Sequence, residues 1–192
     1  PQLSPDGKLL SFLAPRDGVM NLWVSPVDNI DDARPLTAEK RRPLPAYFWA
    51  RNGHDILYVQ DTDGDENFLL YAVNANTGEI RALTDFPKTR VHLYATSWTR
   101  PDEVVIGLNN RDPRWHDAWL LNIETGALSL LHENKESIAG YIVDDALELR
   151  YGVRTRQDGG WDLLKFAPEG GALEVAMSID YEDSSNTGLA GL

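Results

Sequence analysis

The stretch ILYVQDTDGDENFLLYAVNANTGEIRALT at positions 56–84 decides the fold of this chain. Short apolar runs alternate here with a polar loop at 61–67 and a turn at 76–79, and a further apolar run precedes it and ends at Trp49. Runs of about five residues are short for helices and ordinary for strands, and these are rich in β-branched and aromatic residues. The stretch and its flanks therefore predict a unit of four strands.

The same unit recurs along the chain. Four pairs of landmarks share nearly one spacing: Trp49 and Trp98, Tyr71 and Trp119, the Thr-Gly turns at 77–78 and 125–126, and the Leu-Thr pairs at 36–37 and 83–84. Four antiparallel strands in each repeat of about 40 to 50 residues are typical of a β-propeller blade. Gly and Pro fall too often, and an apolar period of 3.6 is too poorly sustained, for a helical repeat.

We therefore predict an all-β fold, a partial β-propeller of about four blades. Their expected limits are 3–43, 46–89, 94–137 and 138–180, with a fifth blade beginning at 181. The fourth blade is the most divergent, with expected turns at 144–145 and 168–171. Because propeller repeats bury their faces only against neighbours, we expect the chain to self-associate through the open faces of its end blades.

Composition excludes several classes of function. The formal charge of -12 and a pI near 4.6 argue against nucleic acid and anionic lipid as partners. Cysteine is absent, which excludes a thiolate nucleophile and a Cys-ligated metal, and no apolar run approaches the length of a membrane helix. The chain begins without Met, so we expect a segment of a longer protein; a bacterial cytoplasmic and a periplasmic location stay equally open.

Candidate functional residues lie in the loops that join the second and third strands of each unit, at 15–20, 60–67, 109–117 and 154–160. Loops of this kind share one rim of a propeller, and function is often carried on such loops. Asp61, Asp63 and Asp65 match the start of a calcium loop. The required Gly and Glu positions hold Glu66 and Ala72 instead, so we expect the acidic side chains to cap loop backbone and no metal to bind.

Four residues are candidates for weak substrate contacts. Glu66 and Asn67 could meet the amine of a substrate, and Arg111 and Arg114 could meet a carboxylate or a partner domain, with solvated side chains as the alternative. The four histidines have no metal-ligand spacing, and no Gly-x-Ser-x-Gly elbow occurs, so we nominate no catalytic residue, metal or cofactor. The recurring tryptophans are expected to be core residues: Trp23, Trp49, Trp98, Trp119 and Trp161.

Three segments resemble the N-terminal propeller of bacterial prolyl oligopeptidase-family serine peptidases, in the dipeptidyl aminopeptidase and acylaminoacyl peptidase branch. They are LSPDGKLLSFLAPRDGVMNLWV at 3–24, ILYVQDTDGDENFLLYAVNANTGEIRALT at 56–84 and GLNNRDPRWHDAWLLNIETG at 107–126. The SPDG turn alone is common to many propellers, whereas its ordered combination with DGDEN and NNRDPRWHD is specific. The fourth unit matches weakly.

The resemblance implies a parent enzyme in which an α/β-hydrolase domain, absent from this chain, carries the catalytic Ser, Asp and His. The propeller would gate and orient short peptides for that domain of the same polypeptide, and this chain alone would be inactive. Some relatives hold a substrate's amino terminus with acidic propeller residues, a role to which Glu66 is comparable. The alternative is a binding module for other proteins, similar to the periplasmic propellers of the Tol system.

Overall fold

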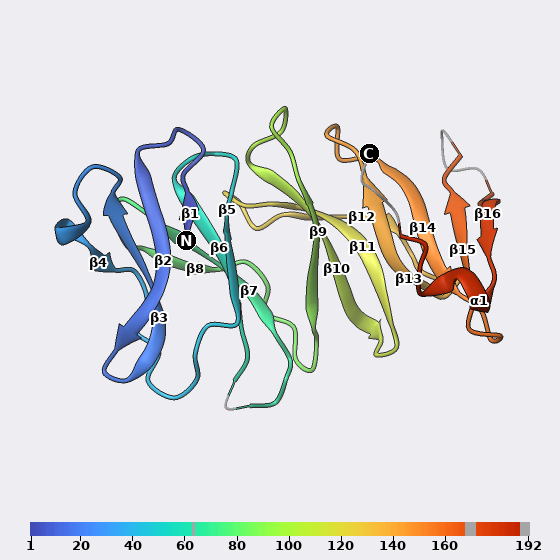
Figure 1. Ribbon diagram of the computed structural model, residues 1–192, viewed down its shortest axis with the longest axis horizontal. Helices are drawn as coiled ribbons and strands as arrows, with labels where there is room; N and C mark the ends of the chain where they lie inside the picture. Colours follow the sequence, from blue (N-terminus) through green and yellow to red (C-terminus); the bar gives the residue numbers. More distant parts are fainter. Residues whose placement is uncertain (63, 168–171, 189–192) are drawn as a thin grey trace. The chain divides into compact units, whose positions relative to one another are not determined.

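The computed structural model describes residues 1–62, 64–167 and 172–188. It divides into two compact units, Pro1–Val91 and His92–Leu192. These residues form four sheets, each from four antiparallel strands that are consecutive in the chain (Figure 1). This arrangement agrees with the expected partial β-propeller built from units of four antiparallel strands.

The first unit contains two sheets. The strands of the first are β1 (Gln2–Leu3), β2 (Leu9–Arg16), β3 (Val19–Pro26) and β4 (Arg34–Pro35), with a 3-10 turn η1 (Ile30–Asp32) before β4. The strands of the second are β5 (Ala46–Trp49), β6 (Asp55–Gln60), β7 (Leu69–Asn74) and β8 (Ile80–Ala82).

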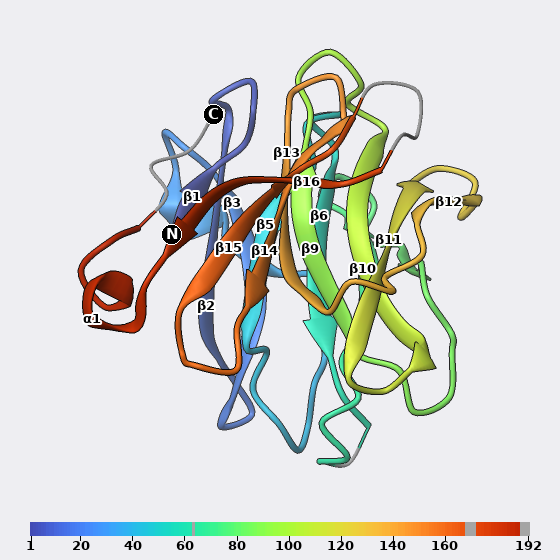
Figure 2. The ribbon, with the colours of Figure 1, turned by 90° about the vertical axis from the view of Figure 1, so that its right-hand side faces the viewer.

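The second unit contains the other two sheets. The strands of the third are β9 (Val91–Thr96), β10 (Glu103–Asp112), β11 (Trp115–Asn122) and β12 (Leu128–His132). The strands of the fourth, drawn from orange to red in Figure 2, are β13 (Ile138–Val143), β14 (Leu149–Thr155), β15 (Trp161–Lys165) and β16 (Glu174–Ile179), and the helix α1 (Tyr181–Ser184) follows.

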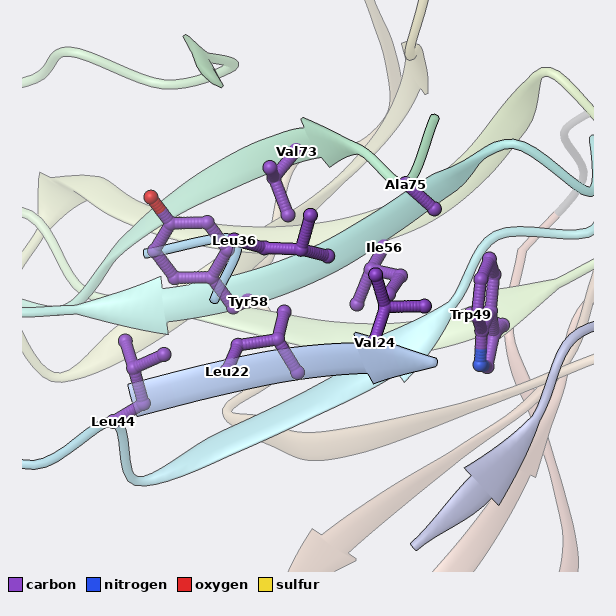
Figure 3. Close-up of a cluster of buried hydrophobic side chains, with 9 residues drawn as sticks. All are labelled: Leu22, Val24, Leu36, Leu44, Trp49, Ile56, Tyr58, Val73 and Ala75. Carbon is purple, nitrogen blue, oxygen red and sulfur yellow. The ribbon is translucent and has the colours of Figure 1, made fainter. Parts of the chain in front are cut away.

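The core of the first unit lies between its two sheets. Leu22 and Val24 from β3 pack with Ile56 and Tyr58 from β6 in one buried cluster (Figure 3). Alternate residues of each strand reach this cluster because successive side chains of a strand point to opposite faces. A polar contact also joins the sheets, since the indole Nε1 of Trp49 donates a hydrogen bond to Ser11 Oγ at 2.8 Å.

The repeated Thr-Gly turns have one structure. The side-chain oxygen of Asn74 accepts the backbone N–H of Thr77, and that of Asn122 accepts the N–H of Thr125, 48 residues later. The glycine that follows has a φ of 77° in the first turn and 71° in the second, a left-handed conformation that glycine adopts without strain. The sequence repeat is therefore also a repeat of turn chemistry.

The repeated Leu-Thr pairs end two of the sheets. Thr37 Oγ1 accepts the backbone N–H of Leu22 at 3.0 Å, and Thr84 Oγ1 accepts that of Leu70 at 2.9 Å. Both threonines are buried. Each threonine lies just after the outermost strand of its sheet. Its hydroxyl oxygen accepts a backbone N–H group that would otherwise be buried without a partner.

Two sequence-based expectations were wrong. Most of the segments 15–20 and 109–117 belong to strands, because the second and third strands of these sheets continue into tight hairpins such as the one at Asp17 and Gly18, both with positive φ. The segment 154–160 lies mostly between β14 and β15, as expected. Trp98 is 59% exposed and is no core residue, since it lies just beyond β9 in a turn. Trp49 is buried as predicted, and Trp23, Trp119 and Trp161 are half-buried.

The turn expected at 168–171 lies outside the described residues. Among the residues that are described, no helix has both the length and the apolar character needed to cross a membrane.

Candidate functional site

Asp61 organises the acidic loop between β6 and β7. Its side chain is fully buried, its Oδ2 accepts the backbone N–H of Glu66 at 3.2 Å, and its Oδ1 lies 3.4 Å from Arg42 Nε. Gly64 has a φ of 91°, and a Cβ there would clash with the Arg42 guanidinium. The loop is thus folded around the buried carboxylate of Asp61 and is covered by Arg42. The acidic residue and the glycine at these positions are therefore required by the structure of the loop.

Asp65 is also used within the loop. Its Oδ1 accepts the backbone N–H of Asn67 and its Oδ2 accepts the Asn67 side-chain amide, both at 3.0 Å. The side-chain bond from Asn67, followed by the backbone bond, lowers the pKa of Asp65 below its usual value. The expected capping role of the acidic residues therefore fits Asp61 and Asp65, whereas Asp63 lies outside the described residues.

Glu66 is presented differently from its neighbours. It has a φ of 58°, it is exposed, and its carboxylate makes no hydrogen bond or ion pair with any described residue. Its backbone is fixed through the N–H that Asp61 accepts. The loop therefore holds the solvent-facing carboxylate of Glu66 on an anchored backbone, and such a group can accept an external cation or N–H donor.

An open cavity of about 540 Å³ lies beside this loop, within the first unit. One wall is the segment 38–42, which joins the two sheets, and the other comes from β6, β7 and β8. The rings of Tyr58 and Tyr71 stack in this wall with centroids 5.3 Å apart. The volume is in the range of small-molecule sites.

Sequence reasoning missed this cavity. The signal available was the basic run Lys40-Arg41-Arg42, which interrupts an acidic chain between two repeats. Its partner surface, the Tyr58 and Tyr71 pair, could not be recognised without the register that places these two residues opposite each other on β6 and β7.

Arg111 and Arg114 share the hairpin between β10 and β11. Arg111 holds the buried carboxylate of Asp117 with two bonds, Nε to Oδ2 at 2.8 Å and Nη2 to Oδ1 at 2.7 Å, and also donates to the Asn134 carbonyl. Arg114, which is largely exposed, makes a similar two-bond contact with Asp112. Both guanidinium groups are therefore engaged with carboxylates of their own hairpin.

Asp117 is an anchor of this hairpin. Burial alone would raise its pKa, but the side-chain bond from Arg111 and the backbone N–H of Asn134 outweigh burial and lower it. On the exposed side, the Arg114 side-chain bond lowers the pKa of Asp112 to about 2. Both carboxylates thus remain charged at neutral pH and keep their arginines occupied.

A comparable pair lies in the fourth sheet. Arg154 Nη2 donates to Asp162 Oδ2 at 2.6 Å, and the two residues face each other in the register of β14 and β15. The side-chain bond from Arg154 is the main cause of the lowered pKa of Asp162. An arginine joined to an acidic residue of the next strand therefore supports the hairpin in both sheets of the second unit.

Two relatives among curated proteins match most of the chain. It is 42% identical over 191 residues to dipeptidyl aminopeptidase BIII of Pseudoxanthomonas mexicana, and 27% identical over 174 residues to dipeptidyl peptidase family member 6 of Caenorhabditis elegans. The alignments cover 100% and 86% of this chain, but only 28% and 23% of the respective relatives. No protein-family model matches the chain.

Solved structures support the fold. A prolyl endopeptidase structure aligns with a TM-score of 0.62 and 12% identity, covering 92% of this chain and 28% of that one. TolB from Acinetobacter baumannii aligns with a TM-score of 0.58 and 11% identity, covering 92% of this chain and 42% of that one. At this identity the likeness concerns the fold alone, and it agrees with four sheets of four antiparallel strands. The chain is therefore a partial β-propeller that is similar over its whole length to part of a dipeptidyl aminopeptidase, in agreement with the resemblance to that branch found in the sequence.

Proposed function

We propose that this chain is the propeller portion of a serine peptidase of the dipeptidyl aminopeptidase type. In this proposal the propeller admits short peptides and orients them for an α/β-hydrolase domain of the same polypeptide. The supporting observation is the 42% identity to dipeptidyl aminopeptidase BIII, which extends over the whole chain. The chain supplies the gate and the hydrolase domain supplies the chemistry, so the chain alone is inactive.

Glu66 is the residue to which we assign recognition of the substrate's free amine. Its carboxylate is exposed and has no bonding partner among the described residues, while Asp61 fixes its backbone. A carboxylate held in this way accepts an ammonium group through charge-assisted hydrogen bonds. Asn67, whose amide is held by Asp65, forms the adjoining edge of the same site.

Arg111 and Arg114 have a lesser part in this proposal. Each is engaged by a carboxylate of its own hairpin, so each would contact a substrate carboxylate only through its remaining N–H groups. We assign them a secondary electrostatic contribution to substrate attraction.

The test is hydrolysis of dipeptidyl p-nitroanilides by the full-length gene product. We expect cleavage of substrates with a free amine, little cleavage of their N-acetylated forms, and no cleavage by the 192-residue chain alone. Glu66→Gln should lower kcat/KM by about 10- to 100-fold through loss of one charge-assisted contact. Asp28→Asn, at an exposed acidic position in the turn after β3, is the matched control and should leave kcat/KM unchanged.

Two results would overturn these assignments. A full-length protein that cleaves none of the dipeptidyl or acyl-aminoacyl substrates, with its hydrolase domain folded, contradicts the peptidase proposal. Equal kinetics for Glu66→Gln and wild type, with the preference for free amines intact, would contradict the role assigned to Glu66 and leave the peptidase proposal standing.

The second candidate is a binding module for other proteins. The observation in its favour is the likeness in fold to TolB, which covers 92% of this chain. A full-length sequence that continues with further blades and contains no Gly-x-Ser-x-Gly elbow would favour this candidate.

We also propose that the isolated chain self-associates through its fourth sheet. Val175 and Met177 of β16 are 55% and 47% exposed, which places apolar side chains of an outer strand in water. Light scattering during size-exclusion chromatography should show a mass above that of one chain. Val175→Lys with Met177→Lys should restore the monomer, and a monomeric wild type at high concentration would contradict the proposal.

A further inference from the structure

The cavity of the first unit combines an apolar floor with polar donors. The stacked Tyr58 and Tyr71 rings and Ile80 provide apolar surface, on which an apolar or aromatic side chain can lie. Figure 3 shows the Tyr58 hydroxyl at the outer end of its ring, directed away from the aliphatic side chains of the core. The floor of the cavity is therefore continuous with the apolar core on one side, and its other side carries the Tyr58 hydroxyl.

The phenol groups of Tyr58 and Tyr71 are available as hydrogen-bond donors to a ligand. Neither hydroxyl has a hydrogen-bond partner among the described residues. Burial, with a smaller contribution from the negative charge of Glu39, raises the pKa of Tyr58 well above its usual value, and burial likewise raises that of Tyr71. Both phenols thus keep their protons at neutral pH and can donate to an anionic oxygen.

The opposite wall carries charges of both signs. Glu39 and Lys40 line the cavity next to each other, and neither side chain pairs with a described residue. The backbone of Glu39 is fixed by Asn21, whose side chain accepts its N–H at 2.7 Å and donates to its carbonyl at 3.0 Å. The charged groups are therefore carried by an anchored segment and can meet a ligand without rearranging the wall.

The remaining charged residues of the cavity do not remove the mixed charge of the wall that Glu39 and Lys40 create. Asp61 and Arg42 lie 3.4 Å apart and compensate each other. Arg41 adds a further positive charge to the wall that carries Lys40. A simple anion would therefore face Glu39, and a simple cation would face Lys40 and Arg41. A ligand that carries both charges satisfies both sides of the wall.

We propose that this cavity binds a small zwitterion, namely a free amino acid or dipeptide with an unblocked amine, an unblocked carboxylate and an apolar or aromatic side chain. The ammonium group pairs with Glu39. The carboxylate lies between Lys40 and the tyrosine hydroxyls, and the side chain covers the Tyr71 ring and Ile80. This site is distinct from the amine contact proposed at Glu66, and it requires no hydrolysis.

The test compares ligands that differ in one charge. Binding of alanyl-phenylalanine, its N-acetyl form and its C-terminal amide to the 192-residue chain is measured by calorimetry, with the tyrosine ring protons followed by NMR. We expect each blocked form to bind about 5-fold more weakly, the size of one partly exposed ion pair. Glu39→Gln should abolish the preference for the free dipeptide over its N-acetyl form and keep the preference over the amide. Lys40→Met should abolish the preference for the free dipeptide over the amide and keep the preference over the N-acetyl form.

Matched variants control for folding and net charge. Asp28→Asn and Lys8→Met remove the same charges from exposed positions outside the cavity and should leave both preferences intact. Absence of binding by the free dipeptide in a folded chain overturns the proposal. Loss of the amine preference in Glu66→Gln but not in Glu39→Gln also overturns it, because the amine would then lie at the loop site of the proposed peptidase function. Hydrolysis by the full-length protein remains a separate result.

Discussion

Trp49 and Ser11 connect the two sheets of the first unit. The indole N–H of Trp49, at the end of β5, donates to the hydroxyl of Ser11 in β2 at 2.8 Å, and both residues are buried. Ser11 Oγ in turn donates to the Gln2 carbonyl at 3.1 Å. The two bonds therefore connect β5 of the second sheet with β2 and β1 of the first sheet, inside a core that is otherwise largely apolar.

Replacing Trp49 by Phe should destabilise the chain by about 1–3 kcal/mol, because a smaller ring leaves a gap and the buried Ser11 hydroxyl loses its donor. Urea unfolding measures this change. Ser11→Ala in the Trp49→Phe background should cost less than Ser11→Ala in wild type, since the shared bond is already lost. Fully additive effects would show that the bond contributes nothing.

The two arginines of the β10–β11 hairpin should differ in their effect on stability. Arg111→Ala leaves Asp117 buried without its main partner and should cost about 2 kcal/mol, less than for a fully buried pair because the guanidinium is partly solvated. Arg114→Ala removes a largely exposed group and should leave the Tm unchanged. Equal losses in thermal unfolding would contradict this distinction.

Asp117 should also make stability depend on acidity. Its folded-state pKa is lowered below the unfolded value of about 4, so its stabilising effect is complete above that value and is lost as the pH falls through the folded pKa. Asp117→Asn should flatten the fall in stability below about pH 4, measured by urea unfolding at several pH values. An unchanged slope would assign the acid sensitivity to other carboxylates.

Two strand glycines provide a matched test of packing. A Cβ on Gly107 would lie 2.7 Å from the Tyr94 ring, whereas a Cβ on Gly140 would meet nothing within 4 Å. Gly107→Ala should therefore cost about 1–3 kcal/mol through overpacking, and Gly140→Ala should change stability by less than about 0.5 kcal/mol. A neutral Gly107→Ala would mean that the Tyr94 ring moves aside freely.

The Leu-Thr pairs predict a graded effect. Thr84→Val leaves the buried Leu70 N–H without its acceptor and should cost about 1–3 kcal/mol. Thr37→Val should cost more, because the Thr37 hydroxyl also donates to Asn21 Oδ1 at 2.8 Å. Amide hydrogen exchange should show faster exchange at Leu22 and Leu70 in the respective variants. Slow exchange at both amides would contradict the role of the hydroxyls.

The sequence predicted the four-sheet arrangement well because its landmarks have local causes. Asn74 and Gly78 form a turn from residues close in the chain, and Thr84 completes its sheet only 14 residues after Leu70. Such features repeat whenever the local sequence repeats. Periodicity therefore sufficed to predict repeated units of four antiparallel strands.

The candidate site was less predictable because it depends on non-local geometry. The backbone of the exposed Glu66 is held by the buried Asp61, and Asp61 in turn lies 3.4 Å from Arg42 of the segment before β5. The pairing of Arg111 with Asp117 likewise depends on how far β10 and β11 extend. The sequence indicated which side chains were available, but not which would be used up by contacts within the protein.

The consecutive pairing within each sheet has a consequence for biosynthesis. Each sheet of the described residues is built from four strands that are consecutive in the chain, so a growing chain can complete its first sheet soon after Thr37 leaves the ribosome. The hydroxyl bond of Thr37 then closes the first sheet before translation supplies the next one. Assembly in this order keeps loop-closure entropy low and limits the time for which strand edges are open to other nascent chains.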